Sequence, residues 1–231
     1  MLSKKVKRVD FLIQSKLKNS INPTYFKNVN FIEFVKNEAE YDYWISLMSL
    51  PYILNKYNYP QPTKNAFIID KKIKLQTSRP AIGLCWRGSK NHVADEFRSI
   101  KLEKFLEIIK LDADFFILQN DLSLPENKFL QPYKEKIHVL LNSKTTFQFT
   151  ASVINNLDLV VTVDTCVMHL AASLNISTIG LLGKKCDYRW GNETKKTNFY
   201  KKLEFIRQED HYEWQDEILQ VKEKISLLFN L

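Results

Sequence analysis

Apolar runs and amphipathic stretches alternate regularly along the chain from about residue 80 onward. Continuous apolar runs predict buried strands at 81–86, 115–119, 137–141, 159–163, 176–182 and 203–206. Between them, apolar residues recur with the helical spacing i, i+3, i+4, i+7 and predict helices over 101–110, 147–157, 167–174 and 214–228. Strands that alternate with helices form parallel sheets, and strands without polar alternation are covered on both faces. The pattern therefore predicts an α/β fold, a Rossmann-like parallel sheet flanked by helices.

The first 75 residues are less regular. Residues 29–34 predict a strand, residues 44–54 a short helix with a bend at Pro51, and residues 59–62 an extended connector. A segment of about 75 residues is too short for a complete second α/β domain of usual size. We therefore expect a partial N-terminal segment and linker over 1–75, and a Rossmann-like domain over 76–231.

The cysteines narrow the class of protein further. Cys85, Cys166 and Cys186 lie far apart, without CxxC or Cys/His spacing. Neither a disulfide framework nor a zinc site is indicated, and a reducing, cytoplasmic compartment fits best. No stretch approaches the ~18 apolar residues of a membrane span. The apolar run at 9–13 is too short for a signal peptide and contains Asp10.

The formal net charge of +8 is concentrated at the N-terminus. Residues 1–30 hold seven Lys/Arg and one acid, Asp10, so the remaining residues are close to neutral. A nearly neutral body argues against nucleic-acid binding. The basic end could contact an anionic membrane surface at the inner face of the membrane, or it could simply be a solvated end.

The strongest candidate site follows the apolar strand at 159–163. Asp164 and Thr165 come directly after this strand, and a helical stripe begins at once. Either residue could cap the helix, which would leave the N–H groups of Cys166, Val167 and Met168 pointing out of the carboxyl edge of the sheet. Free N–H groups and the helix dipole attract anions, so a nucleotide diphosphate would fit here. Ordinary helix caps without a ligand would have the same sequence.

His169 lies on the first turns of the same helix and could reach a phosphate or a sugar hydroxyl, although a histidine beside Leu170 is more often a core residue. His138 falls within a predicted strand, which indicates a structural role.

Two further loops follow strands at the same predicted edge. The loop 86–99 carries Arg87, Lys90 and Arg98, whose cationic side chains suit phosphate oxygens. Alternatively, this segment could be a solvated basic loop. Gly88 would allow the backbone to approach a ligand closely. The loop 184–190 contains Asp187 and Arg189, which could form an ion pair. The aromatic neighbours Tyr188 and Trp190 could stack on a base or sugar of a ligand, or could have a packing role alone.

Several common motifs are absent. The five glycines do not form GxGxxG, and there is no GxxxxGK[ST] or GxSxG. The Asp112–Asp114 pair has metal-binding spacing but precedes a strand, at the wrong end of the sheet. We therefore expect no metal and no separate cofactor, and a site that uses backbone and basic groups.

Together these residues resemble the C-terminal domain of glycosyltransferase family 9, the heptosyltransferase-like group of the GT-B superfamily, and most of all its branch fused to tetratricopeptide repeats. The matching segments run from Gly83 to Trp214 and lie at 83–89, 98–100, 118–119, 157–158, 163–172, 187–190 and 205–208. The most specific element is Asp-Thr-x-x-x-His at 164–169, with Arg-Trp and Arg-Gln behind it. Residues 41–51 also resemble the family's crossing between its two domains.

The resemblance implies transfer of a sugar from a nucleotide-diphosphate donor, in a cleft between two Rossmann-like domains. It implies that residues 164–169 hold the diphosphate and sugar, with help from Arg98 and the Trp86 loop, and that Gln119 lies near the nucleotide. Three departures stand out: most of the acceptor domain is missing, Phe149 stands where an Asp is expected, and Asn175 replaces a helix-ending Gly.

Two functions remain open at this point. The chain could be a glycosyltransferase that acts on a glycan, lipopolysaccharide, lipid-linked or protein acceptor, with a partner chain supplying the acceptor half. Alternatively, it could be a non-catalytic remnant or subunit that binds a nucleotide sugar without turnover.

Overall fold

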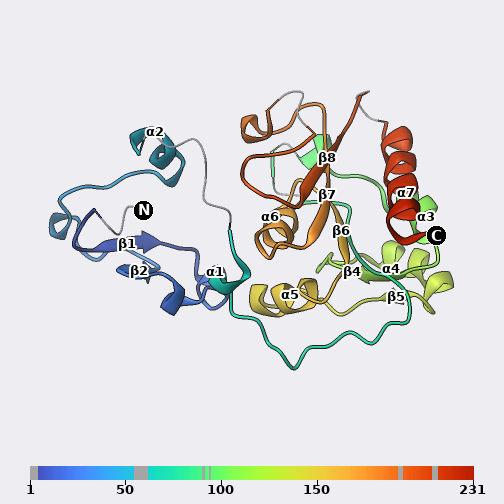
Figure 1. Cartoon of the computed structure of the whole chain (residues 1–231), viewed down its shortest axis with the longest axis horizontal. Coiled ribbons are helices and arrows are strands. Elements are labelled where there is room, and N and C mark those ends of the chain that lie inside the picture. The colour runs from blue at the N-terminus through green and yellow to red at the C-terminus, as the bar shows by residue number, and fades with distance from the viewer. Residues whose placement is uncertain (1–4, 55–61, 90–91, 94, 192–194, 210–212) are drawn as a thin grey trace.

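A six-stranded, fully parallel sheet forms the centre of the molecule. The structure, a computed structural model, describes residues 5–54, 62–89, 92–93, 95–191, 195–209 and 213–231. The strand order is β5-β4-β3-β6-β7-β8 (Figure 1). The strands are β3 (Ala81–Cys85), β4 (Asp114–Ile117), β5 (Ile137–His138), β6 (Leu159–Val163), β7 (Ser177–Leu182) and β8 (Leu203–Arg207). The predicted α/β class with a Rossmann-like parallel sheet is confirmed.

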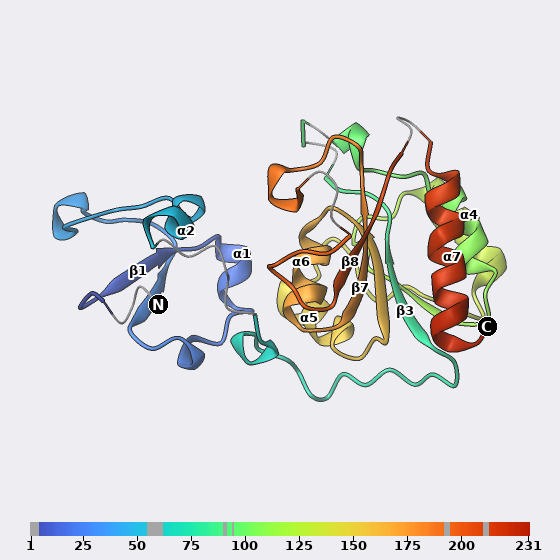
Figure 2. The ribbon, with the colours of Figure 1, turned by 45° about the horizontal axis from the view of Figure 1, so that its top comes forward.

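Helices cover both faces of this sheet, as the unbroken apolar strands predicted (Figures 1 and 2). The helices α3 (Leu106–Ile109), α4 (Leu124–Leu130) and α7 (Gln215–Phe229) pack on the face that carries Ile82 and Leu84. The helices α5 (Phe147–Ile154) and α6 (Cys166–Ser173) pack on the face that carries Ala81 and Cys85. Because side chains alternate along a strand, β3 contributes to both apolar layers and lies between them.

Several elements differ from the predicted ones. The predicted helix 101–110 is a 3-10 turn, η7 (Leu102–Phe105), followed by the single turn α3. The predicted strand 137–141 stops at His138, where its pairing with β4 ends, and the two residues after it are exposed. Helix α4 was not predicted, although Ser123 and Glu126 form a capping box at its start. Further 3-10 turns are η6 (Asp95–Phe97), η8 (Gln131–Tyr133) and η9 (Tyr188–Trp190).

The N-terminal residues form a small separate unit. Its strands β1 (Val9–Leu12) and β2 (Val29–Ile32) pair in parallel with each other, apart from the large sheet. The other elements are α1 (Ser15–Lys18), α2 (Leu50–Ile53), η2 (Pro23–Tyr25), η3 (Glu38–Glu40), η4 (Leu47–Ser49) and η5 (Lys64–Ala66). The predicted helix 44–54 is therefore only η4 and α2, and Pro51 lies in the first turn of α2 rather than at a bend.

A long connector links this unit to the sheet. The teal chain in Figure 2 runs beneath the α5 side of the domain before it enters β3. The amide of Asp70 donates to Ser152 Oγ at 2.9 Å, and Asn156 Nδ2 donates to the Ile73 carbonyl at 3.1 Å. These contacts tie the connector to α5. Residues 59–61 of the predicted connector lie outside the described residues, and a domain boundary near residue 75 stays a prediction.

No helix in the described part of the chain is both long and apolar enough to cross a membrane.

Candidate functional site

The strand order reverses between β3 and β6, at the centre of the sheet. Connections from these two neighbouring strands leave in opposite directions, which opens a crevice at their carboxyl ends, where open α/β sheets bind ligands. The loops after β3 and β6 carry most of the residues predicted from the sequence. This edge is the candidate site.

The turn between β6 and α6 begins at Asp164, as predicted. Thr165 is the N-cap residue, but neither its side chain nor that of Asp164 caps the helix. The Thr165 hydroxyl instead lies 3.3 Å from Thr162 Oγ1 and 3.9 Å from Cys85 Sγ, inside the sheet edge. The expectation of a side-chain cap was wrong, because the threonine faces the core, and the first N–H groups of α6 gain no such partner.

The prediction that three consecutive N–H groups are free of main-chain partners holds for two of them. In the described residues, the N–H groups of Cys166 and Val167 make no main-chain hydrogen bond. The N–H of Met168 donates to the Thr165 carbonyl at 3.1 Å, and the Met168 side chain is fully buried against β7 and β8. The prediction that the Met168 N–H is free was therefore wrong. The first turn of α6 contains a hydrogen bond to the residue three positions back, and this bond uses the Met168 donor.

Arg98 lies at this turn, as predicted, although it is 66 residues away in sequence. Its Nη1 donates to the Asp164 carbonyl oxygen at 2.8 Å, and its Nε donates to Asp95 Oδ1 at 3.1 Å. Gly88 makes room for this arrangement, because a Cβ there would lie 2.3 Å from Arg98 Nη2. The structure shows Gly88 close to Arg98, whereas the sequence suggested that its backbone approaches the ligand itself.

A group of aromatic side chains holds His169 and Asp164 from the other side. Trp190 Nε1 donates to Asp164 Oδ2 at 2.8 Å, and the Trp190 ring stacks on His169 with centroids 5.2 Å apart. His169 Nδ1 lies 2.8 Å from the hydroxyl of Tyr200. Burial lowers the pKa of His169, while the carboxylates of Asp164 and Asp187 act to raise it. Sequence reasoning did not include Tyr200, since nothing in its local pattern distinguishes it from a packing residue.

Arg189 approaches the same edge from η9. Its Nε donates to Asp187 Oδ1 at 2.8 Å, the pairing that the sequence suggested, and its guanidinium lies 5.7 Å from the centre of the Trp190 ring. The cations Arg98 and Arg189 thus each have a carboxylate partner, Asp95 and Asp187. The charges at the edge are nearly balanced, so any anion held here depends on directed N–H donors rather than on net charge.

Three other predicted residues lie deeper or elsewhere. Trp86 is 1% exposed and packs in the core beneath α3, with its indole donating to Glu126. Arg87 pairs with Glu126 and Asp121 and is 11% exposed, so neither side chain is available to a ligand as the sequence suggested. Gln119 is buried at the end of β4 and accepts a hydrogen bond from Cys85 Sγ at 3.6 Å.

Among the remaining expectations, Lys90 lies outside the described residues. His138 stacks on Phe116 and contacts Asp114, which supports its structural assignment. Asp114 begins β4, so the Asp112–Asp114 pair lies at the amino edge of the sheet, as expected. Asn175 follows the end of α6 with φ 59°, a left-handed conformation that glycine adopts most readily and that asparagine also tolerates.

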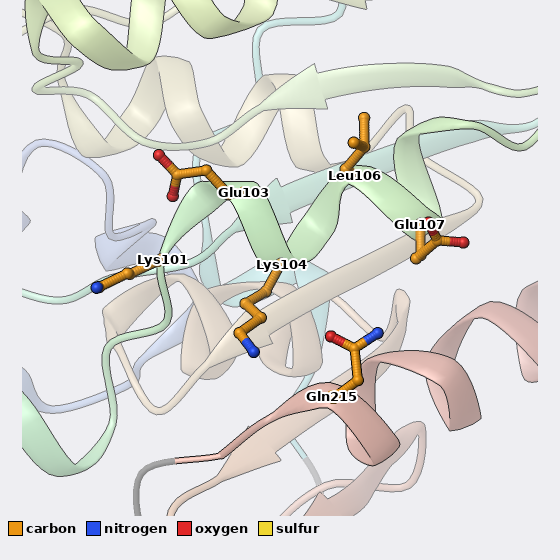
Figure 3. A pocket seen from close by; sticks show the side chains of 6 residues that line it. All are labelled: Lys101, Glu103, Lys104, Leu106, Glu107 and Gln215. Carbon is orange, nitrogen blue, oxygen red and sulfur yellow. The ribbon is translucent and has the colours of Figure 1, made fainter.

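A groove of about 440 Å³ is lined by none of the candidate site residues. The groove is lined by Lys101, Glu103, Lys104, Leu106, Glu107 and Gln215, and Figure 3 shows the Lys104 side chain extending toward Gln215 at the start of α7. Its charged, open lining has none of the apolar walls that ligand pockets usually have. The described residues contain no group of three or more His, Cys, Asp or Glu side chains arranged to hold a metal ion.

A comparison with solved structures supports this fold. Over 80% of its length, the chain resembles the solved structure of E. coli ADP-heptose lps heptosyltransferase II, with 18% identity and a TM-score of 0.51. A glycosyl transferase family 9 structure from Veillonella parvula DSM 2008 matches 64% of the chain and 41% of its own chain, with 18% identity and a TM-score of 0.39. No curated protein matches the chain significantly.

The chain therefore has a Rossmann-like α/β fold similar to that of the E. coli heptosyltransferase II structure. Residues 115–212 match the model of glycosyltransferase family 9 (heptosyltransferase), so the resemblance predicted from the sequence is confirmed. The chain spans 52% of the length of the E. coli heptosyltransferase structure, about half.

Proposed function

We propose that this chain is the donor-binding half of a glycosyltransferase, which binds a nucleotide-diphosphate sugar at the β6–α6 edge and uses no metal. The observation that carries the proposal is the position of Arg98, whose guanidinium is bonded to the carbonyl of the residue that begins the turn. Around that point lie two N–H groups without main-chain partners, those of Cys166 and Val167.

The chemistry of the ligand matches this arrangement. A diphosphate carries about two negative charges, whereas a helix N-terminus offers only about half a positive charge. The planar guanidinium of Arg98 can donate to two oxygens at once, so it adds directed cationic donors at the turn while Asp95 balances its charge. The pair with Asp95 holds that guanidinium in place before the ligand arrives.

Titration of ADP, GDP, UDP and CDP by calorimetry tests the proposal. We expect Arg98→Ala to weaken diphosphate binding about ten- to a hundredfold, which corresponds to one charged hydrogen bond of about 1.5–3 kcal/mol. Lys101→Ala is the matched control, because Lys101 is an exposed cation in the groove rather than at the turn. Equal losses in both variants, or none in either, would show that the phosphate role is wrongly assigned.

Turnover is a separate question from binding. We propose that the intact enzyme transfers the sugar to a glycan, lipopolysaccharide, lipid-linked or protein acceptor, and that a partner chain supplies the acceptor half. The small β1–β2 unit is a suitable docking point, since among the described residues its two strands pair only with each other, and Trp44 of the same N-terminal segment is 91% exposed. Copurification with the product of a neighbouring open reading frame tests this.

Release of nucleoside diphosphate from a panel of nucleotide sugars, with and without that partner, measures transfer. Binding without release in both mixtures would instead leave a nucleotide-sugar-binding subunit.

A further inference from the structure

His169 is held on two sides by aromatic residues from another part of the chain. Its ring stacks on Trp190 with an interplanar angle of 29°, and its Nδ1 contacts the Tyr200 hydroxyl at 2.8 Å. Trp190 is itself bonded to Asp164. These contacts fix both the plane of the imidazole and the direction of its Nδ1 atom.

The other ring nitrogen, Nε2, faces outward. No hydrogen-bond partner for it exists among the described residues, where Arg79 Nε is the only buried polar side-chain atom without a partner. His169 Nε2 is therefore in contact with solvent. The charged groups that act on the ring are Asp164 of the turn and Asp187 and Arg189 of the η9 segment, which are the groups of the candidate site.

The direction of the Tyr200 proton follows from the chemistry of the two groups in contact. The Tyr200 oxygen and Nδ1 of His169 lie 2.8 Å apart, so one of them donates to the other. A phenol, with an ordinary pKa of about 10, is a much stronger acid than the N–H of a neutral imidazole, and a bare imidazole nitrogen is a better acceptor than a phenol oxygen. The Tyr200 O–H is therefore directed at Nδ1 of His169.

Nδ1 can accept this proton only if it carries a lone pair. A neutral histidine has one protonated and one bare ring nitrogen, so the proton of His169 resides on Nε2. Burial lowers the pKa of His169 and Arg189 acts in the same direction, against Asp164 and Asp187, which favours the neutral ring at neutral pH.

We infer that Tyr200 is a positioning residue that sets the tautomer of His169, so that Nε2–H is presented as an uncharged hydrogen-bond donor at the β6–α6 edge. Its acceptor is an oxygen of the phosphate or sugar of the bound donor. This choice of acceptor rests on the proposed function, whereas the tautomer does not. In this state Nε2 carries a proton and does not act as a base.

Nitrogen-15 NMR of the free protein decides the tautomer. The chain has only four histidines, and His169→Gln identifies the signals of this one. We expect the shifts of wild type at pH 7.5 to show a protonated Nε2 and a bare Nδ1, and Tyr200→Phe to lose this preference. Tyr188→Phe, which removes a hydroxyl from an exposed tyrosine nearby, should change nothing. A wild-type ring protonated on Nδ1 or on both nitrogens, or an unchanged tautomer in Tyr200→Phe, would overturn the inference.

Binding of ADP, GDP, UDP and CDP then tests the donor role. Tyr200→Phe should weaken binding of the preferred nucleotide about two- to tenfold, the effect of one neutral hydrogen bond. In the His169→Gln background, where the side-chain amide has no tautomer to set, the same substitution should have no effect. An equal loss in both backgrounds would mean that Tyr200 acts by another route. If wild type binds none of the four, the proposed function fails while the NMR result still decides the role of Tyr200.

Discussion

Replacing Gly88 by alanine would force Arg98 out of its place at the candidate site. The new Cβ would lie 2.3 Å from Arg98 Nη2 and 2.6 Å from Asp95 Oδ1. Both atoms are ends of flexible side chains, so the crowding can be relieved without moving the backbone. The guanidinium would swing away and lose its hydrogen bond to the Asp164 carbonyl, which measures 2.8 Å in the wild type.

The size of the effect follows from that bond. A hydrogen bond from a charged donor contributes about 1.5–3 kcal/mol. The Arg98 side chain is 19% exposed, so water partly screens it and the lower value applies. We therefore expect Gly88→Ala to weaken nucleoside diphosphate binding about tenfold. The free energy of unfolding should fall by about 1 kcal/mol, since the same bond joins the β3 loop to the β6–α6 turn.

A double-mutant cycle separates this mechanism from a general loss of packing. Wild type, Gly88→Ala, Arg98→Ala and the double variant are compared by calorimetric titration and by urea unfolding. Because Gly88→Ala acts through Arg98, it should add less than about twofold in affinity once Arg98 is gone. Additive effects in both assays, or a Gly88→Ala protein that matches wild type, would refute the reasoning.

Three further predictions concern stability and thiol reactivity. Burial alone would raise the pKa of Glu126, but hydrogen bonds led by that from Arg87 lower it to about 2, below the ordinary 4.5. A lowered carboxyl pKa stabilises the folded protein at pH values above the unfolded pKa, so wild type should lose stability as the pH falls from 4.5 toward 2. Urea unfolding at a series of pH values should show a smaller loss of stability for Glu126→Gln than for wild type. In the folded protein, Cys85 should resist iodoacetamide because burial raises its pKa to about 11, whereas the exposed Cys166 should be alkylated. A bound nucleoside diphosphate should slow the alkylation of Cys166, which mass spectrometry measures. Alkylation of Cys166 at the same rate with saturating ligand would argue against the site. Because Asn175 has φ 59°, Asn175→Ala should lower the free energy of unfolding by about 1 kcal/mol and Asn175→Gly should be nearly neutral, and equal stabilities would contradict the role of the left-handed turn.

The strands and the turn of the candidate site could be predicted because their signals are local. The run at 159–163 is apolar at every position and the helical spacing resumes at once, so the turn at Asp164 was placed correctly. Boundaries were less accurate where tertiary context acts. The strand β5 ends after two residues, because its pairing with β4 ends at His138.

The roles of neighbouring residues in one loop could not be predicted. Trp86, Arg87 and Arg98 all follow β3 and all suit a phosphate site by residue type. In the structure Arg87 is neutralised by Glu126 of α4, a helix that the sequence reading did not include, whereas Arg98 reaches the turn. Both cations have a carboxylate partner, and the position of that partner decides which cation reaches the turn: Glu126 lies 39 residues from Arg87 in sequence, whereas Asp95 lies three residues from Arg98.

By itself, the sequence determined the α/β class, the order of its elements along the chain, the position of the β6–α6 turn and the resemblance to glycosyltransferase family 9. These features depend on the burial of apolar side chains, which repeats every two residues in a strand and every 3.6 residues in a helix. That pattern is visible in any short stretch of the sequence. Only the tertiary structure decided that Arg98 and Trp190 meet at Asp164, that Met168 and Trp86 lie in the core, and that Tyr200 holds His169. Those contacts join residues separated by 26 to 66 positions. They exist because the strand order brings β3, β6 and β7 side by side, and no local pattern of hydrophobicity encodes that order.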